Sequence, residues 1–179
     1  MSPAEDHTLI RIPTLRTERF VMRAPRMSDL DAYAAFRGSE RSKGVGGPYN
    51  REQSHDNLCG IIGHWHLEGY GRWMVTDTDD TPLGVVGLMN TPFWPEPEIA
   101  WSVFGDAEGK GVAFEAAQAA RTYAYDVLGW TTAIGCVLAD NTRSHALATR
   151  MGAARDGSFT HEELGELFIY RHPSPEAAA

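Results

Sequence analysis

Residues 108–113 (EGKGVA) carry the clearest chemical signal in the sequence. They follow a predicted strand and open a predicted helix, and a helix N-terminus presents free backbone N–H groups and the positive end of the helix dipole. Gly109 and Gly111 allow an anionic group to approach that backbone closely, and Lys110 adds a mobile cation. The segment is therefore predicted to be a cradle for a pyrophosphate group.

The same residues also have a simpler interpretation. Tight turns from a strand into a helix use glycine for steric reasons alone, and an exposed lysine is commonly just solvated. The segment lacks the GKS/T of a P-loop and the third glycine of a dinucleotide-binding turn. The elements around the turn must therefore decide between the two interpretations.

A strand, a helix and a second strand surround this turn. Residues 98–104 (EIAWSVF) alternate as a half-buried strand does, and residues 131–138 form a β-branched apolar run. Between them lies a helix with a narrow apolar face, ended by Gly129. That face consists of Ala113, Ala116, Ala117, Ala120, Ala124, Val127 and Leu128. The order predicts a right-handed parallel β-α-β unit with the glycine turn at its first connection.

The rest of the chain completes one domain of the α/β (α+β) class. The expected elements are a strand at 19–24, helices at 30–37 and after an Asn50 cap, a hairpin at 72–77 and 83–90, a helix between Asn141 and Gly152, and a strand at 167–171. We expect a mixed, mainly antiparallel twisted sheet flanked by helices, in a single domain over residues 1–172. Residues 173–179 are predicted to be a disordered tail.

Composition excludes several classes of function. The chain has 24 acidic and 16 basic residues, a formal net charge of -8, and no cluster of Lys or Arg, so nucleic acid is a poor partner. No apolar run approaches the ~20 residues needed to cross a bilayer, and the start has no signal-peptide features. Cys59 and Cys136 are interpreted as small buried side chains in a reducing compartment. We therefore expect a cytoplasmic protein without a membrane partner.

A metal site is not expected. His55, His64 and His66 would bind a metal only if their side chains converged. Side chains two positions apart on a helix point away from one another, so His64 and His66 do not form such a pair.

Four motifs, in this order of elements, resemble the GNAT superfamily of acyl-CoA N-acyltransferases over nearly the whole chain. Within it, the chain is similar to the branch that includes ribosomal-protein N-terminal acetyltransferases. The motifs are LRTERFVMRAPRMSDLDAYAAF near the start, EIAWSVF before the glycine turn, EGKGVAFEAA through it, and ADNTRSHALATRMGA after the fifth strand. The resemblance implies a GNAT-like fold and transfer of an acetyl group from acetyl-CoA, used as co-substrate, to an amine.

The resemblance also implies where coenzyme A binds, in a gap between residues 98–104 and residues 131–138. Its pantetheine arm would pair with the backbone of Trp101 and Val103. Its pyrophosphate would bind the amides of Gly109, Lys110, Gly111, Val112 and Ala113. Asn141 and Ser144 would line the far side, near the thiol.

Glu108 departs from the family pattern Q/R-x-x-G-x-G/A, which usually begins with Gln or Arg. A carboxylate that faced the pyrophosphate would repel it. Glu108 is therefore expected to turn to solvent or to bind a nearby cation, and the departure affects cofactor affinity more than the existence of the site.

The resemblance assigns two catalytic roles. Glu98 matches a position that deprotonates the amine through water, and an exposed strand-end carboxylate is the alternative interpretation. Ser144 matches a position proposed to donate a proton to the departing thiolate. A free serine is a poor acid, however, and a helix first-turn serine that makes only local bonds is the alternative. Alignment of the amine and the thioester would itself supply much of the rate.

The acceptor stays open between a peptide N-terminus and a small-molecule amine such as a polyamine, an amino acid or a drug-like amine. Tyr49 and Trp94 lie in segments that line the acceptor pocket in relatives. A homodimer is also left open. The rival functions are a non-catalytic acyl-CoA-binding or sensing module and a purely structural or interaction protein.

Overall fold

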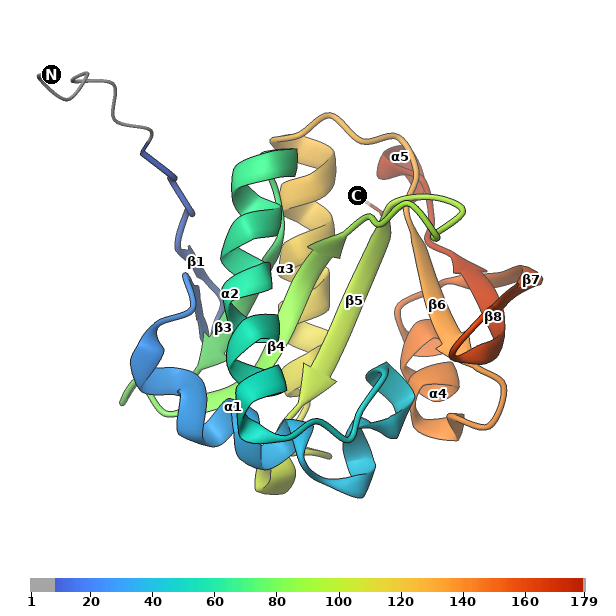
Figure 1. Ribbon diagram of the computed structural model, residues 1–179. Coiled ribbons are helices and arrows are strands. Elements are labelled where there is room, and N and C mark those ends of the chain that lie inside the picture. The colour runs from blue at the N-terminus through green and yellow to red at the C-terminus, as the bar shows by residue number, and fades with distance from the viewer. Residues whose placement is uncertain (1–8, 179) are drawn as a thin grey trace, which may run out of the picture.

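The computed structural model describes residues 9–178 and places them in one eight-stranded sheet with helices on both faces (Figure 1). The strand order is β1-β2-β3-β4-β5-β6-β8-β7, and every neighbouring pair is antiparallel except β5 with β6. The strands are β1 Leu15–Arg16, β2 Val21–Arg23, β3 Arg72–Thr76, β4 Pro82–Met89, β5 Glu98–Val103, β6 Ile134–Leu138, β7 Ala154–His161 and β8 Gly165–Arg171. The predicted mixed, mainly antiparallel sheet is therefore confirmed.

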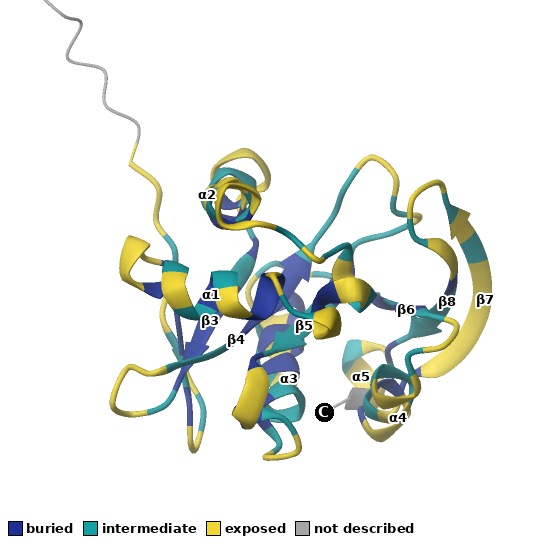
Figure 2. Cartoon of the chain, turned by 60° about the horizontal axis from the view of Figure 1, so that its bottom comes forward, coloured by how far each residue is buried: buried dark blue, intermediate teal, exposed yellow. Residues whose placement is uncertain are grey.

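The α-helices are arranged so that both faces of the sheet are covered. They are α1 Leu30–Arg37, α2 Arg51–Glu68, α3 Val112–Asp126, α4 Thr142–Arg150 and α5 Pro175–Ala178, and the 3-10 helix η2 Glu40–Val45 connects α1 to α2. Figures 1 and 2 show α1 and α2 on one face of the central strands and α3 on the other. Ala116, Ala117, Ala120 and Ala124 of α3 are fully buried, and their small size lets the helix lie close to the sheet.

Several predicted elements lie where the sequence placed them. The helix predicted at residues 30–37 is α1, and the capping box of Asn50 with Gln53 opens α2. Asn141 caps α4, since its side chain accepts a hydrogen bond from the Ser144 N–H. The strands on either side of α3 pair in parallel, as the β-α-β unit requires.

Two strands were not predicted from the sequence. β1 has only two residues, and β7 is almost wholly exposed (Figure 2), so neither shows an apolar alternation. Gly157 adopts a φ of 101° beside a register shift in β7, which interrupts the strand pattern further. Near the end of the described residues, Pro175–Ala178 form α5, and just before it the Tyr125 hydroxyl donates a hydrogen bond to the Pro173 carbonyl at 2.8 Å.

The cysteines correct one further prediction. Cys59 is exposed on α2 and Cys136 is partly buried, and both are free thiols. Cys59 falls on the outer side of α2, whereas Leu58, Ile61 and Trp65 form its buried stripe. Between residues 9 and 178, no helix is long and apolar enough to span a bilayer and no group of side chains could hold a metal ion.

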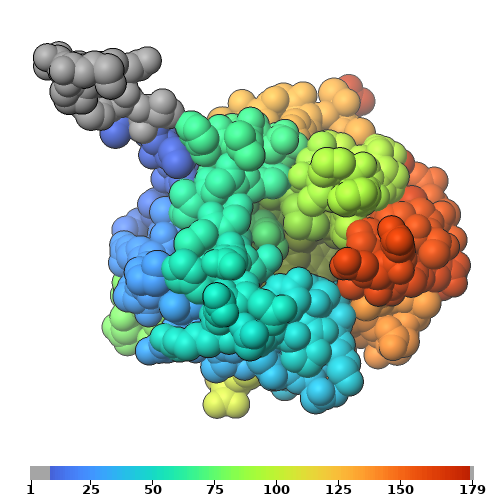
Figure 3. Space-filling view, in the orientation of Figure 1, coloured from blue at the N-terminus to red at the C-terminus, as the bar shows by residue number. Residues whose placement is uncertain are grey.

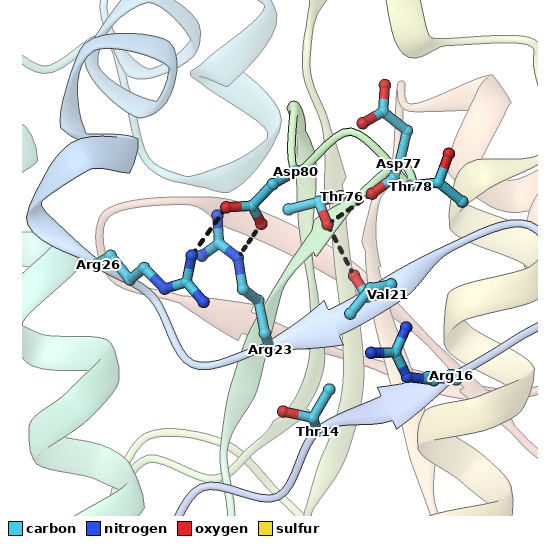
Figure 4. A pocket seen from close by; sticks show the side chains of 9 residues that line it. All are labelled: Thr14, Arg16, Val21, Arg23, Arg26, Thr76, Asp77, Thr78 and Asp80. Carbon is cyan, nitrogen blue, oxygen red and sulfur yellow. Dashed lines mark hydrogen bonds and ion pairs between the residues drawn. The ribbon is translucent and has the colours of Figure 1, made fainter.

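A buried ion pair fixes the edge of the sheet where α1 begins. The Arg23 guanidinium donates to both carboxylate oxygens of Asp29 at 2.8 Å, and both side chains are almost fully buried. Asp80 joins Arg23 to the exposed Arg26 beside a shallow cavity of about 260 Å³ (Figure 4). This cavity lies on the β1–β2 side of the sheet, and none of its lining residues belongs to the predicted cradle.

Replacing Asp29 tests this ion pair. Asp29→Asn leaves the buried Arg23 with the partly exposed Asp80 as its one remaining carboxylate partner, and we expect a loss of about 3 kcal/mol in the free energy of unfolding. Urea denaturation measures this loss. The control Asp31→Asn removes an exposed ion pair with Arg51 and should change the free energy by less than about 0.5 kcal/mol. Equal effects of the two changes would contradict this account of Arg23 and Asp29.

Candidate functional site

The two parallel strands β5 and β6 separate almost as soon as they meet. Their only register pair is Glu98 with Ile134, next to a hydrogen bond from the Ile134 N–H to the Pro97 carbonyl. Because peptide groups alternate along a strand, the same side of β5 presents the peptide groups of Trp101 and Val103 toward β6. Those peptide groups therefore face the split, as the pantetheine prediction requires.

The space-filling view shows a recess on the face that carries α1 and α2 (Figure 3). Residues of η2 and α2 bound it on one side, and the segment before β5 and the β7–β8 hairpin bound it on the other. Strands of the sheet are visible at its floor. A ligand that entered this recess would reach the sheet near the start of β5.

Glu98 lies where β5 and β6 part, and its side chain is buried. Its two carboxylate oxygens accept hydrogen bonds from the Cys136 N–H at 2.7 Å and from the Trp94 indole N–H at 2.5 Å. Burial raises the pKa of Glu98 to about 7, although both hydrogen bonds and the Arg72 charge act in the opposite direction. Glu98 is therefore not an exposed strand-end carboxylate, and it can exchange a proton near neutral pH.

The glycine turn leads into α3 without a side-chain cap. Gly109 and Gly111 have φ values of 73° and 82°, which L-residues rarely adopt, and Gly111 occupies the N-cap position of α3. Since no side chain caps this helix end, the N–H groups of its first turn are left for another acceptor. A pyrophosphate fits this arrangement, and a Cβ at Gly109 would contact nothing within 4 Å.

A cation that sequence reasoning missed lies beside this turn. Arg19 donates to the Lys110 carbonyl at 3.0 Å and forms an ion pair with Glu115 at 2.7 Å. A Cβ at Gly111 would approach the Arg19 guanidinium to 2.9 Å. Arg19 lies some 90 residues before the turn, so no local sequence pattern predicts this contact.

Glu108 binds cations, as one of its two predicted outcomes requires. Its carboxylate contacts the guanidinium groups of Arg41, from η2, and Arg143, from the first turn of α4. The Arg143 contact measures 2.5 Å, and the Glu108 side chain is 28% exposed. The two positive charges of Arg41 and Arg143 thus outweigh the one negative charge of Glu108, and this group of three side chains does not repel a phosphate.

The structure brings Asn141, Ser144 and Trp101 together. Asn141 accepts from the Ser144 N–H at 3.2 Å, and the Trp101 indole N–H donates to the Ser144 hydroxyl oxygen, also at 3.2 Å. The Trp101 ring extends over Gly135 of β6, so it spans from β5 to the other strand. The Ser144 hydroxyl therefore bonds outside its own helix, and its O–H hydrogen is free to donate elsewhere.

His64 contacts backbone carbonyl groups with both ring nitrogens. Its two ring nitrogens lie 2.8 Å from the Tyr70 carbonyl and 3.0 Å from the Asn90 carbonyl. This histidine therefore joins α2 to the segments before β3 and after β4.

The raised pKa of Glu98 predicts how the stability of the protein depends on pH. A carboxyl whose pKa is higher in the folded than in the unfolded state contributes stability that is complete below the unfolded value, here 4.5, and is lost as pH rises through about 7. Relative to Glu98→Gln, the wild type should thus lose roughly 3 kcal/mol of unfolding free energy between pH 4 and pH 8. Denaturation at several pH values measures the difference, and a difference that stays constant with pH would contradict the assignment.

Known proteins share both this fold and part of this sequence. A family model described as an acetyltransferase (GNAT) domain matches residues 19–154. The chain is similar to the crystal structure of an acetyltransferase from Agrobacterium tumefaciens str. C58, with 34% sequence identity, coverage of 95% of this chain and 99% of that one, and a TM-score of 0.83.

Two more distant structures share the fold. One is RimL, the ribosomal L7/L12 alpha-N-protein acetyltransferase in complex with coenzyme A, at 16% identity, 89% and 97% coverage of the two chains and a TM-score of 0.74. The other is spermidine N-acetyltransferase from Vibrio cholerae in complex with CoA and spermine, at 17% identity, 89% and 97% coverage and a TM-score of 0.72. Because the family model matches most of the chain and the Agrobacterium acetyltransferase is 34% identical to it, the chain belongs to the GNAT family of acetyltransferases, which transfer an acetyl group from acetyl-CoA.

Proposed function

We propose that this chain acetylates a primary amine by direct attack of the amine on acetyl-CoA in a ternary complex. The observation that carries this proposal is the buried Glu98 carboxylate at the point where β5 and β6 part, with a pKa of about 7. A base there can accept a proton at neutral pH, close to peptide groups that are free to bind a second ligand.

The split and the glycine turn would hold acetyl-CoA. In this proposal the pantetheine arm pairs with the peptide groups of Trp101 and Val103, and the pyrophosphate binds the amides of residues 109–113. Arg41 and Arg143 offset the charge of Glu108 beside that site. Acetyl-CoA supplies the activated carbonyl carbon and a thiolate leaving group.

Glu98 would act as the general base. As the C–N bond forms, the amine nitrogen loses a proton, which passes to Glu98 directly or through water. The Cys136 N–H and the Trp94 indole hold the carboxylate in one orientation, so little rearrangement accompanies proton transfer.

Ser144 would assist the departing sulfur. As the C–S bond breaks, the thiolate needs a proton or a hydrogen-bond donor, and the Ser144 O–H can provide it. The Trp101 indole N–H donates to the Ser144 oxygen, which stabilises negative charge there and makes the hydroxyl a better donor. Solvent then restores the Ser144 proton, so the balance is one amide and one free thiol formed.

The acceptor in this proposal is a peptide N-terminus or a small-molecule amine. The structural relatives include an enzyme named for a ribosomal protein and one named for spermidine, so both kinds of acceptor occur on this fold. A cytoplasmic location and a homodimer stay predictions.

A thiol-release assay with acetyl-CoA and a panel of amines and peptides tests the proposal directly. Free thiol should appear only when acetyl-CoA and a suitable amine are both present. If acetyl-CoA raises the melting temperature but no amine or peptide releases thiol, the chain is a non-catalytic acyl-CoA-binding module. If millimolar acetyl-CoA leaves the melting temperature unchanged, both interpretations fail.

Glu98→Gln should lower kcat/KM at pH 7 by about 100-fold or more, because Gln cannot accept the proton. In the wild type, kcat/KM should rise as pH increases through about 7, and this limb should be absent from the variant. An unchanged rate in Glu98→Gln would remove Glu98 from the mechanism.

Trp94→Phe provides a graded control for the same carboxylate. It removes the hydrogen bond that lowers the pKa of Glu98, so the pH limb of kcat/KM should move to higher pH while activity persists. A limb at the wild-type pH in Trp94→Phe would show that another group titrates.

Gly111→Asp tests the cradle. A carboxylate and a Cβ at this position should weaken acetyl-CoA binding about 10-fold or more in isothermal titration. Gly69→Asp is the matched control, because Gly69 has a similar φ of 77°, caps α2 and has no neighbour within 4 Å of an added Cβ. Unchanged affinity in Gly111→Asp would show that the cradle is elsewhere.

A further inference from the structure

Two arginines lie on the face of the sheet that carries Glu98 and the recess. Arg72 pairs with Gly87 of β4, and Gly87 pairs with Ala100 of β5, two residues along the strand from Glu98. Paired residues share a face, and so do residues two apart in a strand, so Arg72, Ala100 and Glu98 project to the same side. Arg37, at the end of α1, covers this side from above.

The sheet positions between Arg72 and Glu98 carry only small residues, Gly87 and Ala100. Gly87 has no side chain, and a Cβ there would meet the Gly71 carbonyl oxygen at 2.6 Å and the Arg72 Cα at 2.7 Å, so no larger residue fits. Ala100 contributes only a methyl group. Between a guanidinium on β3 and a carboxylate on β5, the sheet thus presents no side chain larger than a methyl group.

These arginines are not neutralised by a carboxylate of their own. Arg37 is 4% exposed, donates to the Val45 carbonyl at 2.9 Å and stacks on the Tyr49 ring at 4.0 Å, and its Nε is buried without a partner. Within residues 9–178 the half-buried Arg72 guanidinium has no hydrogen bond or ion pair. Within the described residues, Arg72 therefore lacks an acceptor altogether, and Arg37 lacks one for its Nε.

The charges that act on Arg72 are consistent with this arrangement. Burial and the nearby Arg37 lower the pKa of Arg72, whereas Tyr33 and Glu98 act in the opposite direction. Glu98 is the one carboxylate in that set, which also contains the second guanidinium group, that of Arg37. An additional anion would offset the cost of holding both cations away from bulk water.

We propose that the acceptor carries a carboxylate close to its amine, as an amino acid does, and that Arg72, supported by Arg37, binds that carboxylate while the amine faces Glu98. This inference rests on the proposed function and specifies its substrate class. The arginine fork matches a carboxylate in geometry and in charge. A zwitterion adds no net charge beside these arginines, whereas a polyamine would bring further positive charge to two cations that have no carboxylate partner of their own.

The test compares acceptors that differ only in the carboxylate. We expect the wild type to acetylate alanine with a kcat/KM at least about 10-fold above that for alaninamide, and spermidine to be poorer still. Arg72→Met should raise KM for alanine about 10- to 100-fold with little change for alaninamide, and Arg72→Lys should fall between. Affinity for coenzyme A, measured by isothermal titration, should not change.

The matched control is Arg51→Met, which removes an exposed arginine paired with Asp31 on the outer surface of α1 and α2. It should leave the preference for alanine over alaninamide intact. If Arg72→Met does not fold, the preference in the wild type and its reduction in Arg72→Lys still decide the question.

The outcomes separate this inference from the proposed function. Equal acetylation of alanine and alaninamide by the wild type overturns the inference and leaves the proposed function standing. Loss of coenzyme A affinity in Arg72→Met also overturns it, because Arg72 would then serve the cofactor. If no amine releases thiol, the proposed function fails. The carboxylate site is then tested by binding alone: it is supported if alanine raises the melting temperature of the wild type but not of Arg72→Met, and it is overturned otherwise.

Discussion

The site depends on a hydrogen bond that replaces part of a sheet. β5 and β6 share one register pair. Beyond it, the backbone N–H and C=O groups on the facing edges of these two strands lack the hydrogen bonds that a continuous sheet would supply. The Glu98 carboxylate replaces the first of these missing acceptors, because it accepts a hydrogen bond from the Cys136 N–H across the opening. This bond stabilises the separated strands, and the same enclosure brings the carboxylate to a pKa at which it exchanges protons near neutrality.

The charges of the site are balanced by neighbouring side chains at the glycine turn but not around Arg72. At the glycine turn, Arg41 and Arg143 surround Glu108, so a residue unfavourable to phosphate is neutralised by neighbours from η2 and α4. On the face that carries α1, neither Arg37 nor Arg72 has a carboxylate partner within residues 9–178, and Glu98 is the one carboxylate among the charges that act on Arg72. The first arrangement is complete within the protein, while the second needs a ligand to complete it.

Sequence reasoning recovered the elements whose patterns are local. The alanine face of α3, the Asn50 and Asn141 caps and the alternation of β5 are each visible within a few turns or residues. The β7 strand was missed because an exposed strand with a bulge has no apolar alternation, and Cys59 was misjudged because small apolar residues also occur on outer helix faces.

The family resemblance supplied Glu98 and Ser144, but not what surrounds them. The Trp94 and Cys136 donors to Glu98 and the approach of Arg72 depend on strand register and on a loop of irregular structure. Cys136 and Arg72 are distant from Glu98 in the chain, and Trp94, only four residues away, reaches the carboxylate from an irregular loop, so no spacing rule could have found these contacts.

The Arg41–Glu108–Arg143 cluster has a consequence for how the protein responds to ionic strength. It ties a connection on the α1–α2 face to the starts of α3 and α4, and its side chains are 41%, 28% and 77% exposed. Ion pairs this accessible to water are screened when the Debye length shrinks to about 3 Å in 1 M salt. Salt would therefore loosen η2 from the glycine turn while the buried Arg23–Asp29 pair stays intact, so the border of the recess can open without unfolding the sheet that forms its floor.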